Sequence, residues 1–331
     1  MSARRSILPV FIPHLGCPYA CVFCNQHEIT GQAAEQAMAT LQGLCERAAG
    51  DAELAFYGGS FTAIPPQTQK AYLHIAKQAL DLGRIDKIRL STRPDAIDEA
   101  TLKRLREYGV GTIELGAQSM KDNVLALSGR GHSADDVRRS SKLIREFGFE
   151  LVHQMMTGLP GDDDSGAQDT ARQLIELKPD AVRIYPTVIV RGTQLEQMWL
   201  EGKYREHTVE DAVRICSRLL PMFQTAGIPV IRIGLNPTED LSAGAALAGA
   251  YHPALGEMVK SRVLRNQAEN LILQADLFGG DITIQVSDSL LSQMIGQKRC
   301  NVNWLTERFE LRSLKIITCR QAGVLRVFKG T

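Results

Sequence analysis

The chain of 331 residues lacks any apolar stretch that approaches the roughly 18 residues of a membrane-spanning helix. Its one N-terminal apolar run, ILPVFI after Arg4 and Arg5, resembles a secretion signal only superficially. The run is short, Pro9 interrupts it, Pro13 follows it, and no small-residue cleavage site is present. We interpret it as a first buried strand and expect a soluble, cytoplasmic protein with no membrane partner.

The sequence also lacks an excess of charge of one sign. Its 38 Lys and Arg against 37 Asp and Glu give a net charge of +1, so the whole-chain balance does not indicate a polyanionic partner. Residues 260–331 differ, with 11 Lys or Arg against 6 Asp or Glu and a net charge of +5. If RNA or another polyanion docks on the protein, this tail is the first candidate.

Cysteines are few, odd in number and unevenly placed, which does not fit a disulfide framework. Three of the seven fall within eight residues, whereas the others are scattered: Cys45, Cys216, Cys300 and Cys319. This pattern indicates metal ligation in a reducing compartment.

Short apolar or β-branched runs alternate with segments of helical period, which predicts parallel strands joined by helical crossovers. We expect strands at residues 7–12, 53–57, 87–91, 112–115, 150–156, 181–185 and 229–233. Helices are expected near 33–48, 66–82, 98–108, 134–147, 165–177 and 209–225, with Asp98, Ser133 and Thr208 as caps. The fold class is α/β, a full or partial (β/α) TIM-like barrel, with a doubly wound sheet as the alternative.

The pattern changes after about residue 235, and this divides the chain. We expect the barrel at 1–235, a connecting segment at 236–275, and a small α+β domain at 276–331. The last domain has a β-helix-helix-β pattern in DITIQV, SDSLLSQMI, NVNWLTERF and SLKIIT.

The cysteine cluster has the spacing CxxxCxxC in GCPYACVFCNQ. A cubic four-iron four-sulfur cluster usually takes four thiolates, so three from one loop would leave one iron open to another ligand. A structural zinc site is the alternative, because His14 and His27 flank the loop and could supply a fourth ligand. The spacing, the preceding strand and the glycine motif downstream favour the iron–sulfur cluster.

This loop resembles the signature of the radical S-adenosylmethionine (SAM) superfamily. FYGGSFTAI, IRLSTRPDAI, IELGAQSM, GRGHS, QMMTGLPG and VRIYP extend the match across residues 7–260. In order, these motifs are similar to the radical domain of the Elongator catalytic subunit and its short bacterial relatives, and more thinly to oxygen-independent coproporphyrinogen III oxidase. The resemblance implies that Cys17, Cys21 and Cys24 hold a 4Fe-4S cluster whose fourth iron binds S-adenosyl-L-methionine. Reductive cleavage would yield methionine and a 5′-deoxyadenosyl radical, with an electron from a donor such as flavodoxin or ferredoxin.

The resemblance also implies a set of cofactor-binding residues. Gly58, Gly59 and Ser60 would bind the methionyl amine, Arg130 the methionyl carboxylate, and Gln118 and Gln154 the ribose. Alternatives are a tight turn for the glycines, a solvated surface side chain for Arg130, and satisfied barrel polar groups for the others. The set is completed by Phe23, before the third cysteine, and by Ser91 and Arg93, where the porphyrinogen enzymes carry a glutamate on the third strand.

Three further strand residues, Glu114, His153 and Tyr185, have side chains capable of catalysis. For Glu114 and His153 we expect hydrogen-bonded interior positions, and for Tyr185 a position that closes the barrel. The catalytic residues proper are unknown from the sequence.

The tail segment MIGQKRCNVNWL resembles a K-homology domain, in which a loop between two helices clamps a nucleotide backbone. The candidate RNA contacts are Gly296, Gln297, Lys298 and Arg299. Arg299 replaces the second glycine of the pattern, so backbone approach is weakened while charge is added. An accessory dimerisation or lid domain is the alternative.

We therefore expect a radical SAM enzyme that modifies RNA, with tRNA favoured. A radical SAM enzyme acting on a small molecule such as a tetrapyrrole precursor, and a non-enzymatic zinc-stabilised RNA-binding protein, are the alternatives. The sequence shows no acetyltransferase module, no second cluster motif and no cobalamin-binding domain, which leaves hydrogen abstraction or adenosyl-radical addition.

Overall fold

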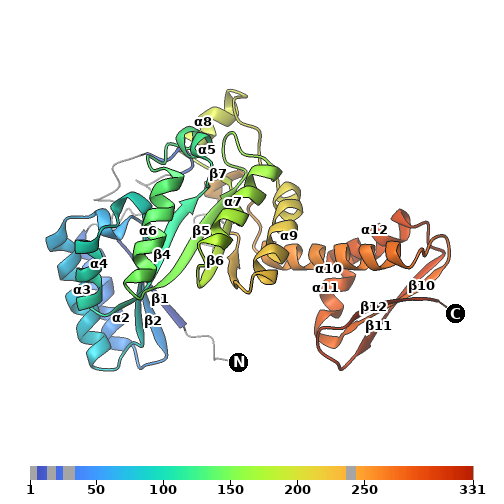
Figure 1. Cartoon of the computed structure of the whole chain (residues 1–331), viewed down its shortest axis with the longest axis horizontal. Helices are drawn as coiled ribbons and strands as arrows, with labels where there is room; N and C mark the ends of the chain where they lie inside the picture. Colours follow the sequence, from blue (N-terminus) through green and yellow to red (C-terminus); the bar gives the residue numbers. More distant parts are fainter. Residues whose placement is uncertain (1–5, 13–19, 25–33, 236–243, 331) are drawn as a thin grey trace.

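The computed structural model describes residues 6–12, 20–24, 34–235 and 244–330. Its main sheet has seven parallel strands in the order β1-β2-β3-β4-β5-β6-β8 (Figure 1). These strands are β1 Ser6–Phe11, β2 Ala52–Tyr57, β3 Lys87–Thr92, β4 Val110–Gln118, β5 Glu150–Thr157, β6 Ala181–Pro186 and β8 Val230–Ile233. A doubly wound sheet reverses its strand order at a switch point, and this sheet does not. The predicted partial barrel is thus confirmed, and the doubly wound alternative is wrong.

Helices connect successive strands of this sheet. They are α2 Ala34–Arg47, α3 Pro66–Asp81, α4 Glu99–Glu107, α5 Asp122–Leu127, α6 Ala134–Glu146, α7 Asp164–Glu176, α8 Gln194–Leu200 and α9 Val209–Thr225. The three predicted caps are confirmed: each of Asp98, Ser133 and Thr208 accepts a hydrogen bond from a backbone N–H in the first turn. A cap of this kind stabilises a helix by about 1 kcal/mol.

Strand alternation sorts the side chains of the main sheet onto two faces. On β4, Ile113 and Leu115 are fully buried in the main hydrophobic core, which also contains residues of α2, α3, α6, α7 and α9. Glu114, between them in sequence, points to the opposite, inner face of the partial barrel. The inner face is where the polar residues of the strands gather.

A second, smaller α+β unit follows the barrel (orange to red in Figure 1). Its elements are α10 Leu255–Gln274, β10 Asp281–Ser287, α11 Leu291–Ile295, α12 Cys300–Arg308, β11 Ser313–Cys319 and β12 Leu325–Lys329. The three strands lie in the order β11-β10-β12, with β10 parallel to β11 and antiparallel to β12. The predicted β-helix-helix-β order is confirmed, whereas α10 and β12 were not predicted. Another unpredicted pair is β7 Val188–Val190 with β9 Ala246–Gly249.

Helix α10 joins the two units. Val259 and Val263 belong to the core of the barrel, and Leu264, Ala268 and Ile272 belong to the core of the C-terminal unit. One continuous helix thereby contributes to both cores and carries the second unit away from the main sheet (Figure 1). None of the described helices is both long and apolar enough to cross a membrane.

Candidate cofactor site

The predicted site residues of the barrel gather at the carboxyl edge of the main sheet. Residues 58–60 follow β2, Arg93 follows β3, Gln118 ends β4, and Arg130 lies between α5 and α6. The described part of the cysteine loop reaches the same edge, because Val22 N–H donates to the carbonyl of Ser128 at 3.1 Å. Parallel strands place their carboxyl ends together, so residues far apart in sequence meet here.

Cys21 and Cys24 are held in a tight turn. The Cys24 N–H donates to the Cys21 carbonyl at 3.0 Å, and the Val22 carbonyl accepts from Leu195 N–H of α8 at 2.7 Å. Cys21 is buried and Cys24 is half-buried. The turn brings the backbones of the two cysteines close together, as ligation of one shared metal centre requires. Cys17 and the candidate zinc ligands His14 and His27 lie outside the described residues.

Phe23 fixes this turn by packing. Its half-buried ring contacts a cluster that includes Ile189 and Leu195, and a second cluster that includes Val124 and Leu159. The cysteine turn is therefore anchored on the β5–β7 side of the barrel as well as by its hydrogen bonds.

Arg130 links the cysteine turn to the end of β4. Its Nη1 donates to Cys21 Sγ at 3.4 Å and its Nη2 to the Gly116 carbonyl at 2.8 Å, while Arg93 donates to the Arg130 carbonyl. The Arg130 side chain is only 8% exposed, so the solvated surface alternative is wrong. A Cβ on Gly116 would lie 3.1 Å from Nη2 of Arg130, which explains the glycine there.

Gln118 presents an acceptor without a partner. Its backbone is left-handed (φ 63°), and its buried Oε1 has no hydrogen bond from any residue that the structure describes. A buried acceptor without a donor is unfavourable unless a ligand supplies one. The Ser60 hydroxyl, by contrast, already accepts from Arg93 N–H at 3.0 Å and lies 3.1 Å from the Thr92 hydroxyl. The residues therefore fit a ligand rich in hydroxyl donors, as the ribose of SAM is.

Below this edge, the inner face of the barrel carries a buried ionic network centred on Glu114. The fully buried carboxylate accepts from Tyr57 of β2, Arg89 of β3 and Arg183 of β6, each at 2.9 Å, and from Gln154 of β5 at 2.8 Å. Arg89 also pairs with Glu53. Four strands therefore meet at one side chain, as predicted for a hydrogen-bonded interior glutamate.

The network fixes the charge of its members. Burial alone would raise the pKa of Glu114, but the guanidinium groups of Arg183 and Arg89 and the hydrogen bond from Gln154 lower it overall. Burial and the Glu114 charge raise the pKa of Tyr57, so this phenol is protonated. The network thus combines one neutral phenol with two glutamates and two arginines of opposite charge.

Gln154 is oriented by this network. Because its Nε2 donates to Glu114, its Oε1 is the atom available for another donor. Ser91 pairs with Glu114 in the strand register, and its alternation with Arg89 places it on the same inner face. Tyr185 likewise shares the parity of Arg183 on β6, and burial raises the pKa of its phenol.

His153 lies on the opposite face of β5. Its Nε2 is 2.8 Å from the Ser141 hydroxyl of α6, and complete burial lowers its pKa to about 3. The side chain is thus a neutral interior residue, as predicted, and it does not reach the inner face.

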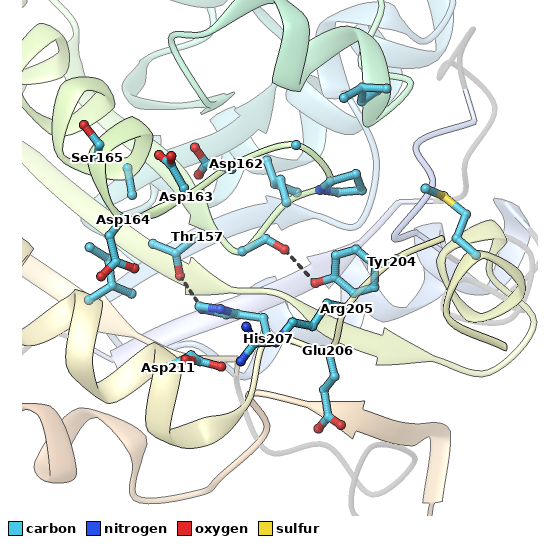
Figure 2. A pocket seen from close by; sticks show the side chains of 18 of the residues that line it. Thr157, Asp162, Asp163, Asp164, Ser165, Tyr204, Arg205, Glu206, His207 and Asp211 are labelled. Carbon is cyan, nitrogen blue, oxygen red and sulfur yellow. Dashed lines mark hydrogen bonds between the residues drawn. The ribbon is translucent and has the colours of Figure 1, made fainter. Parts of the chain in front are cut away.

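A cavity of about 730 Å³ lies behind the carboxyl end of β5 (Figure 2). The Thr157 hydroxyl lies 3.1 Å from Nε2 of His207, and the Tyr204 hydroxyl donates to the Gly158 carbonyl at 2.6 Å. Burial raises the pKa of Asp162, another lining residue, to about 6. Thr157 points to the helix side of the sheet, so the cavity lies on that side. None of the predicted site residues lines it.

The four predicted RNA-binding residues, 296–299, belong to the C-terminal unit and not to the barrel edge. Gly296 has φ 75°, and a Cβ there would meet Cys300 Sγ at 2.6 Å. Gln297, Lys298 and Arg299 are exposed, and the two basic residues have left-handed backbone conformations. The close packing of Cys300 within the loop therefore explains why residue 296 is a glycine.

Sequence reasoning missed several residues of the site. Arg89 and Arg183 share a face with Glu114 by strand alternation, a signal that was readable in the sequence. Gly129, with φ 64°, lets the 128–130 loop approach the cysteine turn, since a Cβ there would lie 2.9 Å from the Ala20 carbonyl oxygen. Nothing local in the sequence marks that approach.

Comparisons with known proteins agree with this architecture. The tRNA uridine(34) acetyltransferase of Methanocaldococcus jannaschii is 29% identical over 176 residues, covering 51% of this chain and 31% of that protein. Human Elongator complex protein 3 is 26% identical over 234 residues, covering 64% of this chain and 41% of that protein. The solved structure of Methanocaldococcus infernus Elp3 with an N-terminal deletion matches with a TM-score of 0.63 at 22% identity, covering 79% of this chain and 63% of that chain. The chain therefore spans less than half the length of these two curated relatives, and the structural likeness shows the fold.

Two family profiles match the chain itself. The Radical SAM superfamily profile covers residues 11–174, and the Radical_SAM C-terminal domain profile covers residues 179–265. Enzymes of this family use a 4Fe-4S cluster and SAM. With the partial barrel, the cysteine turn and both profiles in agreement, the chain belongs to the radical SAM superfamily.

Proposed function

We propose that this protein uses SAM radical chemistry to modify a tRNA nucleoside, with Cys17, Cys21 and Cys24 as the cluster ligands. The observation that carries the proposal is the cysteine turn, which Arg130 joins to the polar edge of β4 through Cys21 Sγ and the Gly116 carbonyl. When bound, the cluster and SAM supply one-electron chemistry that no side chain can supply, and an external donor such as flavodoxin or ferredoxin provides the electron.

The chain's own residues bind and orient in this proposal. The backbone of Gly58 and Gly59, with Ser60, receives the methionyl amine, because Gly58 has φ 98° and no Cβ obstructs it. Gln118 and Gln154 each offer an Oε1 acceptor to the ribose hydroxyls. Ser91 and Arg93 border the same space, and Phe23 holds the cysteine turn beside it.

Arg130 has two roles in this arrangement. Its Nη atoms donate to Cys21 and Gly116, while its buried Nε has no partner in the described part of the chain. Its positive charge neutralises the methionyl carboxylate, for which Nε is the available donor.

The RNA part of the proposal is supported by sequence similarity and by charge. Two of the similar proteins carry names that specify tRNA uridine 34 and Elongator. The net charge of +5 over residues 260–331 and the exposed loop 296–299 suit a phosphate backbone. A uridine of tRNA is therefore the first substrate to test.

The test is anaerobic incubation of reconstituted protein with dithionite, SAM and tRNA transcripts that carry either uridine or cytidine at position 34. We expect 5′-deoxyadenosine in all reactions and an altered nucleoside, detected by mass spectrometry of digested tRNA, only with uridine. Cys21→Ala should abolish both products and reduce bound iron, whereas Cys45→Ala, outside the site on α2, should retain both. Cofactor cleavage that survives Cys21→Ala would overturn the ligand assignment, and an unaltered tRNA beside active cleavage would overturn the substrate.

A further inference from the structure

The sheet of the C-terminal unit has one face that no described helix covers. On β10, Ile282, Ile284 and Val286 are buried against the helices, so the alternate residues Thr283 and Gln285 face outward. The neighbouring strands follow the same alternation, because Leu314 and Ile316 of β11 and Leu325 and Val327 of β12 pack against the same core. The outward face therefore belongs to the remaining residues of each strand.

The strand register assembles these outward residues into two rows. Thr283 lies between Lys315 and Phe328, and Gln285 lies between Ile317 and Arg326. Neighbouring strands are about 4.8 Å apart, so each row is about 10 Å wide. We call these six residues the open face: Thr283, Gln285, Lys315, Ile317, Arg326 and Phe328.

The open face is positively charged, and its charges are unused. Neither Lys315 nor Arg326 pairs with a carboxylate among the residues that the structure describes. Asp281, at the end of β10 on this side, is neutralised by Arg312 and also accepts from Ser313. Among the residues with a described position, the face thus offers two cations without a carboxylate partner and no unpaired anion.

Phe328 supplies an exposed aromatic ring beside these cations. The side chain is 43% exposed, at a position where a soluble sheet ordinarily carries a polar residue. An aromatic ring flanked by Lys and Arg on a sheet is the chemistry that binds unpaired nucleotides, since bases stack on the ring and phosphates pair with the cations.

We propose that the open face binds a single-stranded segment of RNA, with a base stacked on Phe328 and the backbone passing Lys315 and Arg326. This surface is separate from the loop 296–299, which joins the helices on the other side of the unit. The inference rests on the proposed RNA substrate and adds a specific site of contact. A second copy of the chain is the competing occupant, because Phe328 and Ile317 are apolar.

The test measures binding of a fluorescein-labelled 12-nucleotide single-stranded RNA to the full chain by fluorescence anisotropy. Phe328→Ala should weaken binding by about 5- to 100-fold through loss of stacking, and Phe328→Trp should retain it. Phe278→Ala is the matched control, because Phe278 is also exposed in this unit but packs against Phe309. Equal losses for Phe278→Ala and Phe328→Ala would overturn the proposal.

Charge variants test the same surface independently. Lys315→Gln and Arg326→Gln should each make the slope of log affinity against log salt shallower by about 0.7, the value for one phosphate of a single strand. Lys329→Gln removes the same charge from the same sheet but from the helix-facing register, opposite Ile282, and should leave the slope unchanged. Three identical slopes would overturn the proposal.

Two further readouts separate the outcomes. If size-exclusion chromatography with light scattering shows a dimer that Phe328→Ala dissociates, with RNA binding intact, the open face is a self-association surface and the inference is wrong. If wild-type protein modifies tRNA and Phe328→Ala does so equally well with equal affinity, the inference fails while the proposed function stands. If wild-type protein cleaves SAM but neither binds nor modifies RNA, the RNA half of the proposed function fails.

Discussion

The seven-stranded sheet of the barrel and the three-stranded sheet of the C-terminal unit both carry basic side chains on the face opposite their packed helices, but only the barrel sheet neutralises that charge with its own carboxylates. On the inner face of the barrel, Arg89 and Arg183 are buried and share the Glu114 carboxylate. On the open face of the C-terminal unit, Lys315 and Arg326 are exposed and have no carboxylate partner within the described ranges of the chain. In the barrel, the charged side chains pair with one another and hold neighbouring strands together. On the open face, they remain available to a ligand.

The difference also determines what each face can present. In the barrel, buried residues present single acceptor atoms, such as Oε1 of Gln118 at the sheet edge and Oε1 of Gln154 in the network, which suits a small ligand bound in one orientation. In the C-terminal unit, whole side chains are free, which suits an extended polymer with a repeating charge. The degree of burial thus decides which kind of ligand the polar side chains of each face can bind.

The largest expected effect comes from breaking the buried network. Glu114→Gln would leave Arg89 and Arg183 buried without their shared counter-charge, which costs about 3–5 kcal/mol of unfolding free energy. Glu150→Gln is the control, because Glu150 pairs with Lys87 on the same sheet but is about half exposed, and such pairs contribute under about 1 kcal/mol. Urea unfolding at pH 7 measures both. Equal effects would show that the network does not carry the stability of the inner face.

The next largest expected difference between the two units is the effect of acid on their stability. Burial lowers the pKa of His153 to about 3 from its usual 6.5, so the unfolded chain binds a proton that the native barrel excludes. The stabilisation is complete above about pH 6.5 and is lost as the pH falls toward 3, with about 2 kcal/mol gone at pH 5.

The C-terminal unit has no histidine after His252, so it should lack this response. His153→Gln should reduce but not abolish the pH dependence of barrel unfolding, followed by urea titration between pH 7 and pH 5, because burial also lowers the pKa of His132 to about 4. His74→Gln, at an exposed position on α3, is the control. A barrel whose stability is equally pH-dependent in His153→Gln would contradict the assignment.

A smaller effect is expected at the ligand-facing atoms of the barrel. Gln118→Met removes an acceptor that has no partner among the described residues, so the melting temperature of the ligand-free protein should not fall. SAM should bind about 2- to 10-fold more weakly to the reconstituted variant by isothermal titration calorimetry, the loss of about one hydrogen bond. Gln224→Met, at an exposed position near the end of α9, should leave SAM affinity unchanged. Unaltered SAM affinity in Gln118→Met would remove Gln118 from the site.

The sequence predicted the strands of the barrel well, because each is a short apolar run and the first six are each followed by a distinctive motif. It wrongly predicted β1 as a buried strand, since β1 lies at the edge of the sheet with Ile7 and Phe11 exposed. It underestimated β4, predicted at 112–115 and observed as Val110–Gln118, since Gly111, Gly116 and Gln118 are poor strand formers that the neighbouring strands hold in place. It missed β12 because LRVFK is short and mixes charged with apolar residues. Propensity is a weak guide where cross-strand pairing decides.

The placement of the site residues was predictable where it follows a motif, and not where it depends on distant packing. The two described cysteines and residues 58–60 lie at the same sheet edge, where Arg130 and Arg93 link Cys21 to Ser60. The contact between Arg130 and Cys21 joins residues 109 positions apart, and it requires the left-handed glycine at 129 and the space above Gly116. Such contacts depend on loop conformations that no local pattern encodes.

The smallest effect is expected at the exposed ion pair of the C-terminal sheet. Arg312 donates to Asp281 and holds its pKa at about 2, so Asp281 remains charged throughout the range in which His153 titrates. Both side chains are solvent-screened, and an exposed pair contributes little to stability. Asp281→Asn should therefore change the urea midpoint of the C-terminal unit far less than Glu114→Gln changes that of the barrel, at pH 7 and at pH 5. A comparable loss would mean that the C-terminal sheet also depends on its ion pairs, and the contrast between a self-neutralised face and an available face would no longer hold.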